Sequence, residues 1–466
     1  MLFANYEKEH LLKICIIEAG AVPGKTANNS QAIQSAIDTV HAAGGGTVSI
    51  PAGQTFMTGS VEIKSHVTLH LEPGAVLLAS PDIKDYWGID KDENFKQADF
   101  ARYWIYANKA ENIALTGSGT LDANSPAFTA ERLPERTVPR NPRAQSVVFI
   151  GCRNVRVRDL TIRNAPSWAL RPAGCEDVVI DGISILSDLG LVNSDGIDPD
   201  CSRNVRISNC LIEAGDDGIC LKTRKEFADE YGPCENITVT NCVIRSSCAA
   251  LRIGTESFAP IRNAVFSNCV IHGSHRGIVI DGRDPSLIEN IIFSGIRIET
   301  VLSHPVWWHE GEPVYICQVA RPGTARAAEL RNITFADLDI DAETGIYIQG
   351  SPDTRPDNIT FDNIRLRIGR KTEFCAGRFD PRPCDPEFKP AGSGEAAEKT
   401  PWGSLWEHDI PPVFIEHAGH VILRNLNVEF EDNLPPVYKC AIEAHSVDNL
   451  ECINSNVETG ETANAD

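Results

Sequence analysis

Several features are scarce or missing in this sequence of 466 residues, and each absence removes a class of protein. Basic residues are few, because 43 Lys and Arg stand against 64 Asp and Glu, for a formal net charge of -21. Nucleic-acid binders present clustered Lys and Arg to phosphates, so we expect neither DNA nor RNA as a partner. No apolar run approaches the roughly 18 residues of a membrane span, so we expect no membrane partner either.

Signals for export and for zinc are also missing. The first apolar stretch, residues 11–17, is broken by Lys13 and is not typical of a signal peptide. The 15 cysteines include no Cys-x-x-Cys pair. In a large chain without an export signal, they indicate reduced and buried small hydrophobes. We therefore expect a cytoplasmic protein that uses neither a metal nor a cofactor.

Helical periodicity is confined to one segment near the N-terminus. Within residues 28–46, Ile33, Ala36, Ile37 and Val40 fall on one helical face, after N-cap candidates at 28–30 and before the glycines at 44–46. The segments that follow alternate apolar and polar residues as strands do: 47–53, 61–63 and 67–71. The sequence predicts one helix and then an all-β chain.

A repeat decides the fold class. An Asn, or an Asp or His in its place, is followed by apolar alternation, and this unit begins at Asn112, Asn154, Asp177, Asn204, Asn236, Asn263, Asn290, Asn332, Asn358, His420 and Asn449. The starts at 236, 263 and 290 are 27 residues apart, which suits one coil of a parallel β-helix and is too short for a propeller blade. We predict one single-stranded parallel β-helix domain over 1–466, with the helix at 28–46 capping its open first coil.

Longer intervals between repeat starts indicate inserted loops at 301–331 and 369–419. These loops contain Trp307, Trp308 and Trp402. Such aromatic faces either stack on sugar rings and close one end of a groove, or only seal the flank of the solenoid. A second pattern concerns three thiols that each fall six residues after their Asn, and it predicts an inward column of Cys210, Cys242 and Cys269.

The repeat also brings acidic residues of distant coils together. Counted from the Asn of its own coil, Asp216 is at offset 12, as are Cys248 and His275; Asp217 and Arg276 are at offset 13. Coils are separated by about the strand spacing of roughly 4.8 Å, so these side chains are expected to form a ladder along one face. A sugar chain lying along that face would meet one rung after another.

Asp195 extends this ladder by one coil. It lies 21 residues before Asp216, and its offset of 18 from Asp177 requires an insertion in that coil. Together with Asp217, these aspartates suit glycoside hydrolysis by inversion, which needs an acid and a base about 6.5 to 9.5 Å apart with water between them. Like charges raise at least one pKa and keep a proton available. The alternative is that Asp-Gly and Asp-Asp-Gly are ordinary turn sequences.

Several motifs then occur together. They are Gln31-Ala32-Ile33-Gln34, Gly44-Gly45-Gly46-Thr47-Val48, Leu71-Glu72-Pro73-Gly74-Ala75-Val76-Leu77, Asn164-Ala165-Pro166-Ser167-Trp168, Asn193-Ser194-Asp195 and Gly215-Asp216-Asp217. Over residues 15–370 or so, the chain resembles the polygalacturonase family of glycoside hydrolases, family 28. The resemblance implies a right-handed β-helix, inverting hydrolysis without a metal and a pectin-type substrate. It also implies that Asp216 is the general acid, that Asp195 and Asp217 hold and activate the water, and that Asn193 lines the same site.

Two departures from the family pattern bear on the substrate. Ser247-Cys248-Ala249 stands where the family has Gly-His-Gly, and Val279-Ile280-Asp281 stands where it has Arg-Ile-Lys. The resemblance implies that this Arg and Lys bind a galacturonate carboxylate, so their replacement indicates a related but altered sugar. Four basic residues are candidate substitutes as substrate ligands, each being otherwise a solvated or salt-bridged residue: Lys222, Arg252, His275 and Arg276.

The sequence therefore predicts an inverting hydrolase that cleaves α-glycosidic bonds in pectin-derived or related oligosaccharides containing uronate or rhamnose. The long loops favour exo attack on short chains. One alternative is a β-helix polysaccharide lyase or epimerase, which needs a basic residue to take a proton and often calcium. Another is a non-catalytic carbohydrate-binding or adhesive β-helix. The oligosaccharide is the partner we expect, and the oligomeric state is not determined by the sequence.

Overall fold

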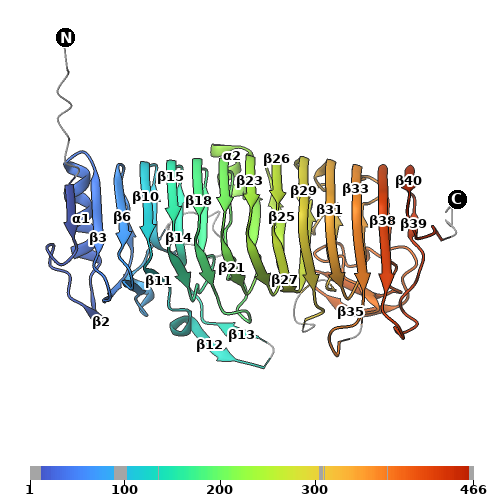
Figure 1. Ribbon diagram of the computed structural model, residues 1–466, viewed down its shortest axis with the longest axis horizontal. Helices are drawn as coiled ribbons and strands as arrows, with labels where there is room; N and C mark the ends of the chain where they lie inside the picture. Colours follow the sequence, from blue (N-terminus) through green and yellow to red (C-terminus); the bar gives the residue numbers. More distant parts are fainter. Residues whose placement is uncertain are drawn as a thin grey trace, which may run out of the picture.

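The computed structural model describes residues 12–88, 102–134, 136–303, 308, 310–374 and 376–460. Strands of successive coils pair in parallel, and the coils stack in chain order along one axis (Figure 1). The chain is a right-handed parallel β-helix, so the predicted fold class is confirmed. Among the described residues, no helix is both long and apolar enough to cross a membrane.

Three faces make up each coil. The first face contains β1 (Leu12–Cys15), β3 (Gly46–Ile50), β6 (Val67–Leu71), β10 (Glu111–Gly117), β15 (Arg153–Arg158), β18 (Glu176–Asp181), β20 (Arg203–Ser208), β23 (Cys234–Thr240), β26 (Ile261–Ser267), β40 (Asn449–Ile453) and the first halves of β29 (Leu287–Thr300), β31 (Glu329–Ala342), β33 (Asp357–Ile368) and β38 (His420–Phe430). The second face contains the second halves of those four strands and β2 (Gly24–Asn28), β4 (Thr55–Thr58), β7 (Val76–Ala79), β11 (Thr120–Asp122), β16 (Thr161–Arg163), β19 (Ser184–Leu186), β21 (Leu211–Ala214), β24 (Val243–Ser246) and β27 (Val270–Ser274). The third face contains β5 (Val61–Glu62), β9 (Arg102–Asn108), β14 (Gln145–Ile150), β17 (Leu170–Ala173), β22 (Ile219–Thr223), β25 (Ala249–Ser257), β28 (Arg276–Asp281), β30 (Val314–Cys317), β32 (Ile346–Gln349), β37 (Val413–Glu416) and β39 (Glu443–His445).

The repeated Asn marks the turn at which the chain enters the first face. Asn204 and Asn263 both have φ of 57°, in the left-handed region that Asn tolerates better than most residues. Its side-chain amide also donates to the equivalent residue of the preceding coil, as Asn358 does to Asn332 at 2.7 Å and Asn332 does to Asn290 at 3.1 Å. The repeat therefore records one turn conformation and one hydrogen-bonded ladder.

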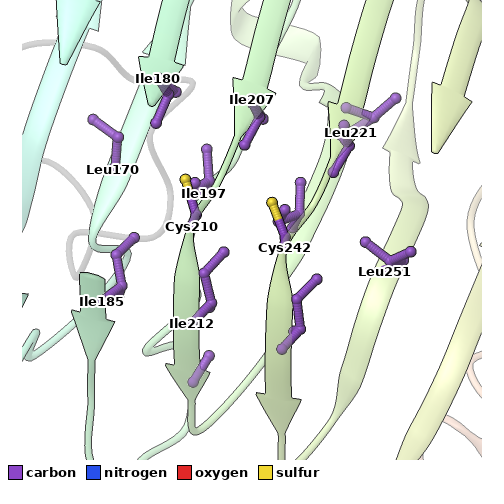
Figure 2. Close-up of a cluster of buried hydrophobic side chains, with 14 of the residues drawn as sticks. Leu170, Ile180, Ile185, Ile197, Ile207, Cys210, Ile212, Leu221, Cys242 and Leu251 are labelled. Carbon is purple, nitrogen blue, oxygen red and sulfur yellow. The ribbon is translucent and has the colours of Figure 1, made fainter. Parts of the chain in front are cut away.

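Inward side chains of the three faces form one continuous core. Figure 2 shows Cys210 and Cys242 at equivalent positions on neighbouring coils, and both are at most 2% exposed. Each thiol donates to the carbonyl oxygen two residues before it, at 3.1 Å and 3.3 Å. Cys269 continues this column, so its predicted packing role is confirmed, and the described cysteines form no disulfide.

Four phenylalanines stack along the core of the C-terminal half. Phe266, Phe293, Phe335 and Phe361 are 0% exposed, and successive ring centroids lie 4.6, 5.2 and 4.5 Å apart. Phe293→Ala is expected to lower the free energy of unfolding by about 3–5 kcal/mol, because it removes the middle of the stack and leaves a cavity. Denaturant unfolding measures this change.

The adjacent residue provides the control for that variant. Ile292 points outward from the same strand and is 42% exposed. Ile292→Ala is therefore expected to change stability by less than about 0.5 kcal/mol. Equal losses in the two variants would contradict the assignment of Phe293 to the core stack.

The predicted helix is present but shorter than 28–46. It is α1 (Ser30–Ala42), which buries Ile33, Ala36, Ile37 and Val40. Residue 28 instead ends β2, and its side-chain oxygen accepts from the Ser30 N–H at 3.0 Å. Residue 46 begins β3, because the preceding glycines take positive φ angles that end the helix. The capping role of α1 stays a prediction.

The predicted insertions at 301–331 and 369–419 also contain solenoid strands. The first range carries β30, and the second carries β37 and a small antiparallel sheet of β34 (Arg378–Phe379), β36 (Gly403–Glu407) and β35 (Ala396–Thr400). A further insertion forms the hairpin β12 (Thr129–Arg132) and β13 (Thr137–Pro139). The hairpin and β35 project from the same side of the solenoid in Figure 1. Smaller elements are α2 (Lys225–Tyr231), β8 (Trp87–Gly88) and 3-10 turns at Ile83–Asp85 and Ser125–Phe128.

Candidate active site

The turn between the second and third faces carries the predicted ladder. The Gly196 N–H donates to the Asp217 carbonyl at 2.8 Å, and the Gly218 N–H donates to the Ala249 carbonyl at 2.8 Å. The Arg276 N–H donates to the Cys248 carbonyl at 2.9 Å. These backbone bonds join successive coils and place the following residues along one edge: Asp195, Asp216, Asp217, Cys248, His275 and Arg276.

The two aspartate motifs interlock. A Cβ atom on Gly196 would lie 2.3 Å from the Gly218 carbonyl oxygen, so the coils can approach this closely only with glycine there. The Ser194 hydroxyl donates to the Leu191 carbonyl at 2.7 Å and accepts from the Gly215 N–H at 3.1 Å. The residues beside the aspartates therefore fix one motif against the other and hold the carboxylates in place.

Asp216 combines partial exposure with a proton-retaining environment. One carboxylate oxygen accepts the Asn193 backbone N–H at 2.8 Å, and the side chain is only partly buried. Burial and the neighbouring Asp217 raise the pKa of Asp216. Asn193 adopts φ of 57°, and its side-chain oxygen accepts from the buried Arg143 guanidinium at 3.1 Å. Asp216 is therefore suited to carry a proton to a bound substrate.

Asp217 lies in an environment that keeps it ionised. Its two oxygens accept from Nη1 of Arg252 at 3.1 and 3.2 Å, and the Lys222 Nζ lies 3.8 Å away. Burial favours the neutral acid, yet Arg252, Lys222 and Arg276 together hold the pKa of Asp217 below its usual value. The adjacent residues 216 and 217 thus have pKa values pushed in opposite directions, which is the pattern of an acid and base pair.

Two further aspartates are almost completely buried beside this pair. Asp195 is 3% exposed, and burial followed by the charge of Asp198 raises its pKa well above the usual range. Asp198 is 0% exposed, and burial raises its pKa to about 8. Neither oxygen of Asp198 has a hydrogen-bond partner among the described residues, nor does Oδ1 of Asp195. Ionisation of one carboxyl in this cluster opposes ionisation of its neighbours, and Asp217 is the member that faces Arg252 and Lys222.

The four candidate substrate ligands divide into two groups. Lys222 lies 5.1 Å from the Trp168 ring and faces Asp217, while Arg252 pairs with both Asp217 and Asp281. Their charges are therefore engaged by the protein itself. Nη2 of Arg276 donates to the Cys248 thiol at 2.7 Å, but its Nε and Nη1 have no hydrogen-bond partner among the described residues. Arg276 is only 1% exposed, so these two unpaired donors lie inside the protein beside Cys248.

Asp195, Asp216 and Asp217 form the acidic row of the ladder. His275 belongs to a pocket next to this row. Its Nδ1 lies 2.8 Å from the Ser303 hydroxyl. A cavity of about 220 Å³ is lined by both residues together with Glu310 and Arg378, which form an ion pair at 2.6 Å. Burial raises the pKa of Glu310 to about 8. The pocket is large enough for a sugar-sized group within two coils of Asp217.

The arrangement does not favour a metal site. One atom each of Asp216, Asp217 and Cys248 lie within 4.8 Å of one another. However, the guanidinium groups of Arg252 and Arg276 already contact Asp217 and Cys248. Burial also raises the pKa of the Cys248 thiol well above its usual value, whereas a metal ligand must be deprotonated. We assign no metal or cofactor to these residues.

The pattern expected for glycosyl hydrolases family 28 matches residues 44–379, which include every rung of the ladder. The chain belongs to this family. The prediction of a glycoside hydrolase is thereby confirmed at the level of the family.

Relatives of this family 28 protein carry more specific names. A "probable polygalacturonase" of Vitis vinifera is 30% identical over 239 residues, which are 49% of this chain and 48% of the relative. An "exo-poly-alpha-D-galacturonosidase" of Dickeya chrysanthemi is 25% identical over 292 residues, covering 52% and 48% of the two chains. The chain thus spans about half the length of the curated relatives it matches. The solved family 28 exopolygalacturonase of Yersinia enterocolitica shares the fold, with a TM-score of 0.68, 18% identity and coverage of 96% of this chain and 78% of that one.

The two departures from the family pattern lie within this site. Cys248 contacts Arg276, and its carbonyl continues the ladder between coils. Val279 carries no charge. It is 0% exposed and packs with Tyr315 in an apolar cluster on the outer side of the third face. Asp281 is also 0% exposed and pairs with arginines. The place that the family pattern gives to two cations is therefore occupied in this chain by an apolar residue and an ion pair.

The sequence does not assign a role to three residues of the site. Arg143 orients Asn193 from an inserted loop, Asp198 adds a buried carboxyl with a raised pKa, and Asp281 pairs with two buried arginines. Asp198 lies in the same six-residue motif as Asp195, which is the one signal that marks it. Of the loop tryptophans, Trp308 lies 6.4 Å from Trp402, and Trp307 lies outside the described residues.

Proposed function

We propose that this family 28 protein is an inverting, exo-acting hydrolase of α-linked pectic oligosaccharides that contain uronate or rhamnose. The observation that carries this proposal is the contrast between two adjacent carboxyls: Asp217 faces Arg252 and Lys222, whereas Asp216 is partly exposed and accepts the Asn193 N–H. The cytoplasmic location stays a prediction.

In this mechanism Asp216 is the general acid. Its partial exposure lets it reach the glycosidic oxygen, and burial and the neighbouring Asp217 shift its pKa in the direction that favours the protonated form a general acid needs. Proton transfer to the leaving oxygen breaks the bond to the anomeric carbon, and Asp216 is left as a carboxylate beside the Asn193 N–H. That hydrogen bond stabilises the charge that forms.

Asp217 is the base that activates water. It is ionised before the reaction because Arg252 and Lys222 face it, and it takes the proton of the attacking water. Asp195 lies one coil away and keeps its proton, so its hydroxyl can hold the same water in position. Attack from the face opposite to the leaving group inverts the anomeric configuration.

Three observations support the substrate and the exo mode. The buried Arg276 has two guanidinium nitrogens without hydrogen-bond partners among the described residues, and a uronate carboxylate that enters beside Cys248 would satisfy them. The pocket of about 220 Å³ lined by His275 has room for a sugar at the end of a chain. Relatives in two organisms are named for exo attack on galacturonate chains.

Hydrolysis of defined oligosaccharides, followed by NMR of the anomeric proton, tests the proposal. The panel contains α-linked galacturonate oligomers and rhamnogalacturonan fragments of fixed length. The expected first product is a monosaccharide or a single end unit of inverted configuration. Retention of configuration would contradict the mechanism, and release of internal fragments would contradict the exo mode. Absorbance from a new carbon–carbon double bond would indicate a lyase instead.

Replacement of Arg276 tests the uronate contact. Arg276→Ala is expected to lower kcat/KM on a free uronate oligomer by about 10- to 100-fold, because a charge-assisted hydrogen bond to the carboxylate is lost. The loss is expected to be much smaller on the methyl-esterified oligomer, which lacks that charge. Arg206→Ala, an exposed change on the first face, is the control and should retain full activity. Equal losses on both substrates would contradict carboxylate binding.

A further inference from the structure

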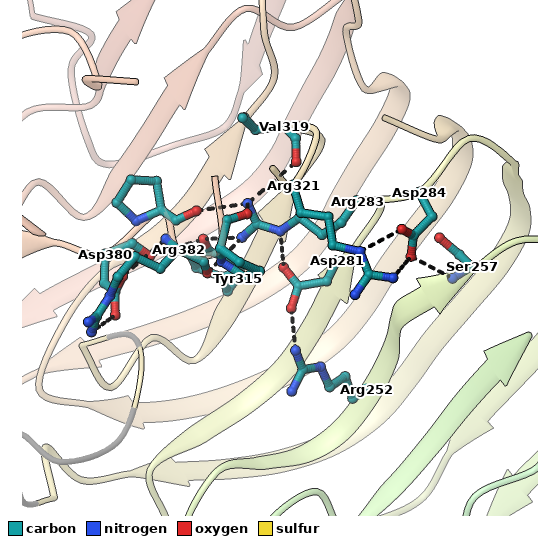
Figure 3. A network of polar contacts seen from close by, with 12 residues as sticks. Arg252, Ser257, Asp281, Arg283, Asp284, Tyr315, Val319, Arg321, Asp380 and Arg382 are labelled. Atoms are coloured by element: carbon teal, nitrogen blue, oxygen red, sulfur yellow. Dashed lines mark hydrogen bonds and ion pairs between the residues drawn. The ribbon is translucent and has the colours of Figure 1, made fainter. Parts of the chain in front are cut away.

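Asp217 is the first member of a line of buried ion pairs that leads away from the acidic row. Arg252 donates from Nη1 to Asp217 and from Nη2 to Asp281 at 2.7 Å. The second oxygen of Asp281 accepts from Nε of Arg283 at 3.0 Å, as Figure 3 shows. Arg252 is 8% exposed, and both Asp281 and Arg283 are 0% exposed. A buried charge without a partner is strongly destabilising, so each of these residues depends on the charge of its neighbour.

The line of ion pairs ends at Arg283, whose terminal nitrogens donate to backbone carbonyl groups rather than to another carboxylate. The two terminal nitrogens of Arg283 donate to the carbonyl oxygens of Pro381 at 2.7 Å, Arg382 at 3.1 Å and Pro383 at 3.1 Å. Nη2 also donates to the Tyr315 hydroxyl at 3.1 Å. One guanidinium thus fixes three consecutive peptide groups of the segment 380–383.

The segment 380–383 in turn supports the loop aromatics. Arg382 makes two hydrogen bonds of 2.8 Å to the Asp380 carboxylate, and the Tyr315 hydroxyl donates to the Asp380 carbonyl at 3.1 Å. The Arg382 guanidinium lies 5.7 Å from the centre of the Trp308 ring, and Trp308 lies 6.4 Å from Trp402. The loops that bear an exposed aromatic surface are therefore connected to the catalytic base through a continuous set of contacts.

We propose that Arg252, Asp281 and Arg283 are positioning residues that hold Asp217 in its ionised state and tie its location to the segment 380–383. The proposal deepens the function proposed above and rests on the role given there to Asp217. Asp281 stands where the family pattern has a lysine, so in this chain a position expected to bind substrate charge orders the base instead.

Arg252 has the largest favourable effect on the charge of Asp217. The charged and titratable groups that face Asp217 are Asp195, Asp198, Asp216, Cys220, Lys222, Cys248, Arg252 and Arg276. Removal of the Arg252 charge leaves the acidic neighbours in excess and raises the pKa of Asp217. Because the base must be deprotonated, the acid limb of the pH profile of kcat/KM then moves to higher pH.

The first experiment compares three variants of Arg252. In Arg252→Met the acid limb of the kcat/KM profile is expected to move to higher pH by about one unit or more, the usual effect of losing a paired arginine. In Arg252→Lys the limb is expected to stay in place while kcat falls, because an ammonium does not bridge two carboxylates as a guanidinium does. The double variant Arg252→Met with Asp281→Asn removes both charges and is expected to shift the limb equally, even where the single variant folds poorly. An unchanged limb in the folded variants would overturn the proposal.

The second experiment replaces Arg283, at the end of the line of ion pairs that holds the segment 380–383. Arg283→Met releases the segment 380–383 and is expected to raise KM at least about fivefold while also lowering kcat; Arg283→Lys is expected to restore part of both. An unchanged KM would overturn the link to that segment. A ¹³C NMR titration of the Asp217 carboxyl, identified by the signal missing in Asp217→Asn, does not require turnover. If no oligosaccharide is hydrolysed, the proposed function fails, and an unshifted carboxyl titration in Arg252→Met then overturns the positioning role separately.

Discussion

Replacement of Asp216 by Asn is expected to lower kcat on an oligosaccharide by about 10²- to 10⁴-fold, the range typical of a lost general acid. The two side chains have nearly the same shape, and the amide oxygen of Asn can still accept the Asn193 N–H that now bonds to the carboxylate at 2.8 Å. The variant therefore loses the proton and little else. Steady-state hydrolysis measures the loss, and thermal unfolding checks that the fold is kept.

An activated leaving group separates acid catalysis from other roles of Asp216. A nitrophenolate departs without protonation, so the loss is expected to be much smaller on an aryl glycoside of the same sugar than on the oligosaccharide. Asp188→Asn is the matched control, because Asp188 lies just before the motif at residues 193–198 of the preceding coil and its side chain bonds to Arg132 and Thr137. Equal loss on both substrates would contradict the assignment of Asp216 as the acid.

Replacement of Asp217 by Asn is expected to lower kcat by a similar factor, about 10²- to 10⁴-fold, because no charged base remains to activate water. The loss has a different signature from that of Asp216, since it is expected on both the oligosaccharide and the aryl glycoside. It also leaves Arg252 and Lys222 facing a neutral amide. The pH profile of the residual activity is expected to lose its acid limb.

Added azide provides the decisive measurement for Asp217. A small anion can occupy the space of the activated water next to Arg252 and does not need a base, so azide is expected to restore turnover of the aryl glycoside. NMR of the product is expected to show a glycosyl azide of inverted configuration. Glu213→Gln, a partly buried change on β21 of the same coil, serves as the control and should be insensitive to azide. Rescue of Asp216→Asn but not of Asp217→Asn would reverse the two assignments.

The fold was predictable because its physical cause repeats along the chain. Each coil needs a left-handed turn residue and an inward set of apolar side chains, so Asn204 and Asn263 recur with the same φ, and Cys210 recurs as Cys242 and Cys269. The helix was predictable from its apolar face. The predicted range 28–46 was too wide at both ends, because residue 28 ends β2 and the glycines at 44–46 take positive φ angles after the helix has ended at Ala42.

The acidic row was predictable from the same period. Asp216 and Asp217 could be aligned with the next coils from their offsets because backbone hydrogen bonds keep successive coils in register, whereas Asp195 required an insertion in its own coil. The functions of the basic residues were not predictable in this way. Arg252 and Arg276 lie on neighbouring coils, yet Arg252 pairs with Asp217 and Asp281, while two nitrogens of the buried Arg276 have no hydrogen-bond partner among the described residues. Side-chain direction and the presence of a buried partner separate them.

The amino-acid sequence by itself determined the coil period, the row of aspartates and the family, because these depend on regular spacing and on local turn chemistry. Only the tertiary structure decided in which direction each carboxyl pKa is shifted, which arginine has nitrogens without hydrogen-bond partners among the described residues, and that Asp281 pairs with Arg252 and Arg283. The physical reason is that charge states depend on burial and on partners from other coils and loops. Such partners, including the segment 380–383 that Arg283 holds, lie up to about a hundred residues away in the chain.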